Sequence, residues 1–438
     1  MIVPRPDVAL AHRLFRQLHD DSADGDGVTR DAYGPGEQRA HDLIAAEGAR
    51  LGLEQHVDPA GNLLLTLAGR DRGAKRVLIG SHLDSVVRGG DYDGPVGVLA
   101  GLACLAGMVA AEFRPERDIG LIVTRAEEAG AWFAVSFPGS RAALGTLERE
   151  ALSVPRRDTG RTLAQHMRDA GFMPERIEPG AGWLGADNVA AFLEVHIEQG
   201  PVLDGLDVPL GIVTGIPGSR RHRAIRIIGE SNHSGATPRA YRRDAAMAAA
   251  ELAFRLDQEW ARMLAEGHEL VCTVCVLATG ADAAFTLIAG SARMELDMRS
   301  VSRDSLDLLH DALERLAAEI SVRRQVTIEL GPETGSQACA MAAGIQAGLA
   351  RAAASLGHAT HRMASGGGHD AAAFAQAGVP AGMLFVRNQN GSHSPREAMH
   401  MADFDVAAEM VMHWLLADPA AADAGLWAGR PDTDNGRP

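Results

Sequence analysis

The stretch Gly80-Ser-His-Leu-Asp-Ser-Val-Val-Arg-Gly-Gly-Asp-Tyr-Asp-Gly-Pro-Val-Gly97 combines imidazole and carboxylate side chains directly after an apolar run. That run, Val77-Leu-Ile-Gly80, predicts a buried strand, and the glycines and proline that follow predict a loop. His82, Asp84 and Asp93 therefore lie just beyond a strand end. Imidazole and carboxylate groups suit a divalent metal, and one carboxylate can bridge two metals. A metal site would indicate a hydrolase, with further ligands elsewhere in the chain.

Three more apolar runs, at 118–124, 189–195 and 379–386, predict strands that end in candidate ligands. These ligands are Glu127 and Glu128, His196, and His393. In open α/β sheets, ligands bind outside the carboxyl ends of the strands, so four such ends indicate one shared site. Taken singly, each residue also has an ordinary structural interpretation, such as a solvated Glu pair or a turn at an Asp-Gly step. Their joint placement favours the functional interpretation.

Composition restricts the class of protein. The chain has 438 residues, a formal net charge of −15 and 23% charged residues, which is typical of a globular protein with two domains. The negative charge argues against nucleic acid and anionic membranes as partners. The start of the chain lacks a signal-peptide core, and no apolar run reaches the roughly 18 residues of a membrane span. Four cysteines without a disulfide framework favour a reducing compartment, so we expect a cytoplasmic protein.

The order of predicted elements divides the chain into a catalytic α/β domain and an inserted α+β domain. Strands and helices alternate up to a Gly- and Pro-rich segment at 210–218, where we place the boundary. The catalytic domain then comprises 1–211 and 331–418, and the inserted domain 212–330. Within the insertion, the predicted order β-α-β-β-α-β is that of a ferredoxin-like unit, with its second helix capped by Ser302. The remaining residues, 419–438, are expected to form a loosely ordered tail.

The candidate ligands fit a site with two metals. A shared anionic ligand is needed, and Asp93 is the natural one. Asp84 is better placed to orient the His82 ring than to bind metal, because ligand histidines usually need an anionic or carbonyl partner. Glu127 and Glu128 are adjacent, so they cannot meet one ion with the same geometry. One of them would bind metal, and the other would act as general base on the attacking water.

Several of these motifs closely resemble the hydantoinase/carbamoylase family of amidases, within the dinuclear zinc aminoacylase/carboxypeptidase superfamily. The resemblance covers nearly the whole chain. Its motifs are Gly80–Val98, Glu127-Glu128, Glu194-Val-His-Ile-Glu-Gln-Gly-Pro201, Gly229-Glu-Ser-Asn-His-Ser-Gly-Ala-Thr-Pro238, Ser365-Gly-Gly-Gly-His-Asp-Ala371 and Gly391-Ser-His-Ser-Pro395. The resemblance implies a metallopeptidase-like catalytic domain with an inserted ferredoxin-like dimerisation and lid domain.

The same resemblance implies a role for each candidate residue. His82, Asp93 and His196 would hold one ion, and Asp93, Glu128 and His393 the other. Glu127 would be the general base. The ions would be two zinc ions, with manganese, cobalt or nickel as alternatives, since His, Asp and Glu ligands accept all four metals. Gly367 and His369 lie in a glycine-rich loop beside the site, although His369 could instead be a structural loop residue.

Residues of the inserted domain would complete the site in a homodimer. The resemblance implies that His233 reaches the partner subunit's active site and steadies the oxyanion. Arg299 would bind the substrate carboxylate through its planar guanidinium, and Gln199 lies at a family position near the substrate. Among the departures from the family pattern, Thr286 stands where a substrate-binding Asn is expected. A hydroxyl cannot reproduce the donor pair and acceptor of an amide, so we expect altered substrate recognition there.

These observations predict an amidohydrolase that cleaves the carbamoyl or ureido C–N bond of a small carboxylate-bearing substrate, such as an N-carbamoyl-L-amino acid or allantoate. An N-acyl-amino acid or dipeptide hydrolase of the same superfamily is the alternative. A catalytically silent ligand-binding homologue is an alternative of another class, and the intact ligand set and Glu127 argue against it.

Overall fold

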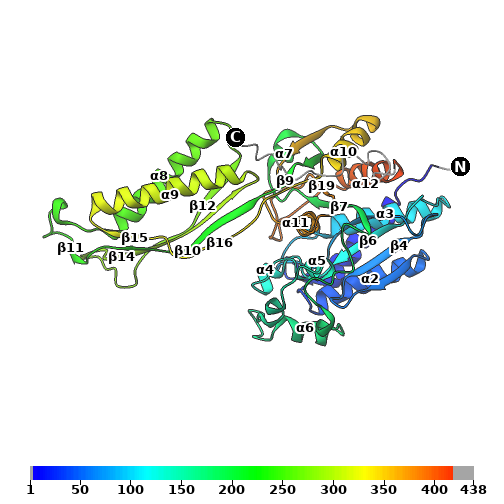
Figure 1. Cartoon of the computed structure of the whole chain (residues 1–438), viewed down its shortest axis with the longest axis horizontal. Helices are drawn as coiled ribbons and strands as arrows, with labels where there is room; N and C mark the ends of the chain where they lie inside the picture. Colours follow the sequence, from blue (N-terminus) through cyan, green and yellow to red (C-terminus); the bar gives the residue numbers. More distant parts are fainter. Residues whose placement is uncertain (1–2, 418–438) are drawn as a thin grey trace, which may run out of the picture. The chain divides into compact units, whose positions relative to one another are not determined.

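The computed structural model describes residues 3–417, which form two compact units (Figure 1). The first comprises residues 3–214 and 340–417, and the second comprises Gly215–Cys339. The second boundary falls at 339/340 rather than at the predicted 330/331, because β16 (Glu333–Ser336) pairs with β10 (Gly218–Ile228) and so extends the inserted unit. The predicted tail, 419–438, lies outside the described residues. Within residues 3–417, no helix is long and apolar enough to cross a membrane.

An eight-stranded mixed sheet forms the centre of the first unit, in the order β18-β8-β19-β7-β5-β6-β4-β3. Its four central strands, β19, β7, β5 and β6, run parallel, so their carboxyl ends meet at one edge. The strands are β3 (Glu54–Val57), β4 (Leu63–Leu67), β5 (Arg76–His82), β6 (Ile119–Thr124), β7 (Val189–Ile197), β8 (Leu210–Val213), β18 (Thr360–Met363) and β19 (Ala381–Val386). All four strands predicted to carry candidate ligands are confirmed.

Helices α2, α3, α10, α11 and α12 pack on this sheet, and the unit's largest apolar core lies between helices and strands. The helices of the unit are α1 (Val8–Ser22), α2 (Pro35–Arg50), α3 (Pro95–Ala110), α4 (Ala129–Trp132), α5 (Pro138–Ala143), α6 (Leu163–Asp169), α7 (Val202–Leu206), α10 (Ala343–Leu356), α11 (Asp370–Gln376) and α12 (Met401–Leu416). A short two-stranded pair joins β1 (Ala23–Asp24) to β2 (Gly27–Val28). A second pair, β9 (Gly215–Ile216) with β17 (Cys339–Ala340), lies where the chain enters and leaves the second unit.

Helix α3 follows the opening motif and packs directly on β5, β7 and β6. It begins at Pro95, whose fixed φ suits the first helical turn, after Gly94 in a left-handed conformation (φ 86°). Its small residues allow close contact with the sheet. A Cβ on Gly97 would lie 2.1 Å from the Val195 carbonyl oxygen. The sequence of this helix therefore sets how closely the ligand-bearing strands approach it.

We expect Gly97→Ala to destabilise the protein by about 1–3 kcal/mol, because the added methyl group overpacks this contact and the helix must shift. Gly205→Ala is the matched control, since a Cβ at Gly205 on α7 meets nothing within 4 Å. Urea denaturation midpoints of the two variants and the wild type measure the difference. Equal midpoints for Gly97→Ala and the wild type would contradict the close packing of α3.

The longer elements of the second unit follow the order β-α-β-β-α-β, to which shorter strands are added (green to yellow in Figure 1). Its antiparallel sheet has the order β12-β14-β10-β15, with β16 also paired to β10, and helices α8 and α9 pack on it around a separate core. The elements are β10, α8 (Ala245–Ala265), β12 (Leu270–Thr279), β14 (Ser291–Ser300), α9 (Arg303–Arg324), β15 (Thr327–Glu329) and β16, with the small pair β11 (Asn232–His233) and β13 (Leu287–Ile288). Ser302 caps α9 as predicted, by accepting a hydrogen bond from the Ser305 backbone.

Candidate functional site

The candidate ligands of the first unit gather at the carboxyl edge of its parallel strands. His82 is the last residue of β5, and His196 is the second-to-last residue of β7. Glu127 and Glu128 follow β6, and His393 lies in the loop after β19. The structure therefore brings together five residues from four distant segments of the sequence, and the loop after β5 adds Asp93.

The first ligand group consists of His82, Asp93 and His196, all of them buried. The two Nε2 atoms are 3.3 Å apart, and His196 Nε2 lies 3.2 Å from Asp93 Oδ1. On the far side of each ring, Nδ1 of His82 lies 3.1 Å from the Asp84 carbonyl oxygen, and Nδ1 of His196 lies 2.9 Å from the Ile197 carbonyl oxygen. A ring that donates Nδ1–H to a carbonyl presents its Nε2 lone pair to the centre, as metal-ligating histidines do.

The second group consists of Asp93, Glu128 and His393. Nε2 of His393 lies 2.8 Å from Glu128 Oε1 and 3.4 Å from Asp93 Oδ2. Asp93 thus directs one carboxylate oxygen toward each group, which is the arrangement of a bridging ligand. Ser392 and Gln199 also donate hydrogen bonds to Oδ2, the latter at 2.7 Å.

The surroundings of the other carboxylate oxygen of Asp93 indicate that His82, Asp93 and His196 fit a cation. Oδ1 is buried and accepts no hydrogen bond from any described residue, although two imidazole nitrogens face it. Three converging lone pairs in a buried space are unfavourable unless a proton or a cation lies between them. His, Asp and Glu donors in this number are those of zinc and related divalent ions, so the donor set fits the predicted metals.

Asp84 connects the end of β5 to the Glu127-Glu128 pair. Its carboxylate lies 3.3 Å from His82 Nδ1, which supports the predicted orienting role. The same carboxylate accepts hydrogen bonds from the backbone N–H groups of Glu127 and Glu128, each at 3.0 Å. Just before this pair, Ala126 adopts a left-handed conformation (φ 58°), and its N–H donates to Glu37 on α2. These contacts fix the backbone from which the two glutamates diverge.

Glu127 lies beside the first ligand group and outside the second, with Oε2 3.9 Å from His82 Nε2. Burial raises the pKa of Glu127 well above its usual range, His82 opposes this shift, and the carboxylates of Glu128 and Asp370 add to it. A nearby cation would favour the ionised form. The structure separates the two glutamates as the base-and-ligand interpretation requires, and the catalytic role of Glu127 stays a prediction.

The glycine-rich loop lies against the first group. His369 is buried, its ring lies 4.5 Å from that of His196, and its Nε2 shares a hydrogen bond with Ser365 Oγ at 2.9 Å. Gly367 is close to Gln199, since a Cβ there would lie 3.3 Å from Gln199 Oε1. These contacts favour His369 as a packing residue behind the ligands, and they place Gly367 beside the predicted substrate residue Gln199.

Three predicted site residues belong to the second unit. His233 on β11 pairs with Leu287 on β13, and the carbonyl of the neighbouring Thr286 accepts a hydrogen bond from the Ser234 backbone. His233 and Thr286 are therefore neighbours, and both are exposed. Nδ1 of His233 accepts hydrogen bonds from the backbones of Gly235 and Ala236, so its neutral ring carries the proton on Nε2. Arg299 lies near the carboxyl end of β14, and its guanidinium donates hydrogen bonds to the Asp297 carboxylate.

Three buried carboxylates behind the ligands were missed at the level of sequence. Glu397 accepts hydrogen bonds from the backbones of Tyr92 and Asp93, and its Oε2 lies 2.9 Å from Ser392 Oγ. Burial raises the pKa of Glu397 to about 7. Glu194 accepts from the Ala371 backbone, and Asp370 accepts from Ser140 and Thr124. Glu194 and Asp370 lie inside motifs already quoted, two residues before His196 and one after His369, so their positions offered a signal. Glu397 offered none.

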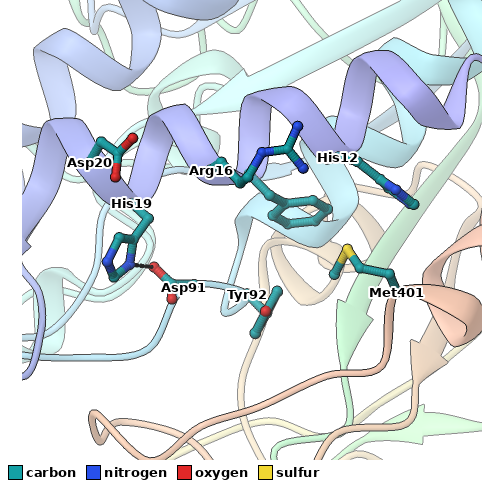
Figure 2. A pocket seen from close by; sticks show the side chains of 8 residues that line it. His12, Arg16, His19, Asp20, Asp91, Tyr92 and Met401 are labelled. Atoms are coloured by element: carbon teal, nitrogen blue, oxygen red, sulfur yellow. Dashed lines mark hydrogen bonds and ion pairs between the residues drawn. The ribbon is translucent and has the colours of Figure 1, made fainter.

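A cavity of about 310 Å³ lies between α1 and the segment of Asp91 and Tyr92 (Figure 2). Residues of α1 line it, together with Asp91, Tyr92 and Met401. None of the candidate ligands lines this cavity, so it is separate from the predicted centre. The Tyr92 ring packs 5.5 Å from that of Phe15, and His19 pairs with Asp91 at 2.9 Å. These contacts anchor the Asp93 loop to α1.

The fold and the ligand pattern agree with a known class of protein. A family model described as peptidase family M20/M25/M40 matches residues 78–417, and the chain belongs to this family. Among curated relatives, the N-carbamoyl-L-amino acid amidohydrolase of Geobacillus stearothermophilus is 37% identical over 400 residues, covering 89% of this chain and 94% of the relative. The allantoate amidohydrolase of Bacillus subtilis is 31% identical over 384 residues, covering 86% and 89%.

A solved structure is also similar over almost its whole length. The hydantoinase/carbamoylase family amidase from Burkholderia ambifaria superposes with a TM-score of 0.84 at 30% identity, covering 95% of this chain and 98% of that one. The resemblance inferred from the motifs is therefore confirmed.

Proposed function

We propose that this protein is a dinuclear metal amidohydrolase that cleaves the carbamoyl or ureido C–N bond of a small carboxylate-bearing substrate. The observation that carries the proposal is Asp93, whose two carboxylate oxygens face two separate groups of ligand side chains. The named activities of the two curated relatives supply the reaction class. N-carbamoyl-L-amino acids and allantoate are the first candidates.

The positions of the residues, together with the resemblance to the amidase family, support the following roles. His82, Asp93 and His196 would hold one zinc ion, and Asp93, Glu128 and His393 a second. When bound, the ions would lower the pKa of a shared water and polarise the substrate carbonyl. Glu127 would take a proton from the attacking water and return it to the leaving nitrogen. His233 would donate its Nε2–H to the developing oxyanion, and Arg299 would bind the carboxylate and so fix the position of the scissile bond.

The second unit itself supports a site shared between two chains. Arg299 pairs with Ser219 at the start of β10, whereas His233 lies beyond the end of that strand. Eight residues of β14 separate Arg299 from Ser291, the partner of Ile228, which corresponds to about 25 Å along the strand. One small substrate cannot contact both residues of the same chain. We therefore propose that each active site uses Arg299 from one subunit and His233 from the other.

An exposed sheet edge supplies the surface for such a homodimer. β12 is the outer strand of the second sheet, and its ten residues carry no charge and no proline. A long uncharged edge readily pairs with another strand. On the adjacent α8, Phe254 is 62% exposed and Met247 51%. We propose that two copies pair through β12 and α8, so that the second unit acts as the dimerisation domain and, by moving with bound substrate, as the lid.

Mixing two inactive variants tests the shared site. We expect His233→Ala and Glu127→Gln homodimers each to be nearly inactive. After the two are mixed and allowed to exchange subunits, about half of the dimers should be heterodimers by statistics. In each heterodimer one site has an intact Glu127 and receives an intact His233 from its partner. Recovery of about a quarter of wild-type activity is therefore expected. No recovery under proven exchange would contradict the shared site.

The substrate is identified by a screen of N-carbamoyl-L-amino acids, allantoate and β-ureidopropionate against protein loaded with zinc, manganese, cobalt or nickel. Release of ammonia or of the free amino acid is the measurement. Faster cleavage of N-acetyl amino acids or dipeptides would favour the alternative hydrolase. Binding of a ureido compound without turnover of any amide would favour a silent homologue and overturn the proposal.

A further inference from the structure

We propose that the second unit holds a structural metal site, distinct from the predicted catalytic centre, formed by His222 on β10, His310 on α9 and Glu333 on β16. One ligand atom from each residue lies within 4.8 Å of the others. The chemical class of the ligand is a divalent transition-metal ion, with zinc first, since two imidazoles and one carboxylate suit it. This site would fasten β16 and α9 to β10.

His222 supplies the first argument. The residue is 2% exposed, and its Nε2 is buried without a hydrogen-bond partner among the described residues. Its Nδ1 lies 3.2 Å from the Leu330 carbonyl oxygen, which makes Nδ1 the protonated nitrogen and leaves a lone pair on Nε2. An orphaned acceptor in the protein interior is unfavourable. A cation at Nε2 would satisfy it, and the carbonyl at Nδ1 is the usual orienting partner of a metal-bound histidine.

The arrangement of the two rings supplies the second argument. The His222 and His310 centroids are 5.3 Å apart with an angle of 18° between the ring planes. The corresponding values for His82 and His196, in the predicted catalytic centre, are 5.6 Å and 30°. Two imidazoles bound tetrahedrally to one ion have centroids about 5 Å apart for metal–nitrogen bonds of about 2.1 Å. Both pairs therefore have a spacing that suits a shared ion.

The third ligand and the local charge are compatible with a cation. Oε2 of Glu333 lies 3.2 Å from His310 Nε2. Arg220 binds the same carboxylate through two nitrogens, at 2.9 and 2.7 Å, and holds it toward the histidines. The positive charge of Arg220 is also offset by Asp307, at 2.9 Å. Asp311 and Glu314 lie beside His310 as well, so carboxylates outnumber the arginine around the site.

Metal counting on the full chain tests the site independently of catalysis. The background variant Asp93→Ala/His196→Ala/His393→Ala removes both predicted catalytic groups. After dialysis against micromolar zinc, we expect this variant to retain one zinc per chain, measured by mass spectrometry of the metal. Adding His222→Gln should remove that zinc. The matched control adds His268→Gln, a second-unit histidine whose Nδ1 contacts Ser305, and should leave it bound.

A zinc-edge anomalous diffraction map of the wild-type chain provides a measurement that needs no variant. We expect a peak within bonding distance of His222 Nε2 and His310 Nε2 at three equivalents of zinc. Absence of that peak, absence of zinc from the background variant, or zinc that persists after His222→Gln in a chain with unchanged circular dichroism would each overturn the proposal.

Discussion

Glu127→Gln should lower kcat by about 10³-fold while the bound metal is unchanged, because general acid–base groups typically contribute about 10²–10⁴-fold. The amide keeps the size of the carboxyl group but cannot accept the proton. Glu127 also lies outside the group formed by Asp93, Glu128 and His393, so its loss removes no predicted ligand. The measurement is kcat on the best substrate of the screen, together with metal content per chain.

Glu128→Gln is the matched control for this variant, since it alters the neighbouring residue with the same chemistry. It should lose metal from the second group, because Glu128 lies 2.8 Å from His393. Excess zinc should partly restore its activity, whereas excess zinc should not restore Glu127→Gln. A wild-type kcat in Glu127→Gln would overturn the proposed mechanism.

Asp93→Ala should have the largest effect of any single substitution, because this carboxylate serves both ligand groups. We expect the loss of both metals and a fall in activity of at least about 10³-fold. Ligands also stabilise the folded state, by about 2.7 kcal/mol at a concentration 100 times Kd. Zinc should therefore raise the Tm of the wild type more than that of this variant, in which only the proposed site in the second unit remains.

Asp91→Ala is the control for Asp93→Ala, since Asp91 lies in the same loop and pairs with His19 outside the centre. Its zinc-induced rise in Tm should equal that of the wild type. If Asp93→Ala kept both metals, the bridging assignment would be wrong.

The framework of the site could be predicted from the sequence because each candidate ligand lies next to the strand that positions it. Each ligand follows an apolar strand, and parallel strands necessarily end at one edge of a sheet. The positions of His82, His196 and His393 follow from that rule. By contrast, adjacency alone cannot tell which of Glu127 and Glu128 binds metal. The directions of the two side chains depend on the left-handed Ala126 and on Asp84, a residue of a distant segment that accepts hydrogen bonds from both backbone N–H groups.

Features that depend on distant pairing escaped prediction. The extension of the second unit to Cys339 requires β16 to pair with β10, more than a hundred residues earlier in the chain. All four residues of β16 are exposed, so this segment lacks the alternation of apolar and polar residues that indicates a strand. The role of Glu397 likewise depends on contacts with Tyr92 and Asp93, about three hundred residues away. Neither the pairing of β16 nor the contacts of Glu397 can be predicted from the residues that neighbour them in the sequence.

The contacts of Glu397 bear on how the metal preference of this enzyme could be altered. This carboxylate ties the loop of Asp93 to the loop of His393 through Ser392, so neither loop can shift alone. A substitution meant to adapt one position to a larger or softer ion would displace the ligands of the other position as well. Substitutions in the proposed centre must therefore be designed for both predicted metal positions together, including Asp93 and Glu397.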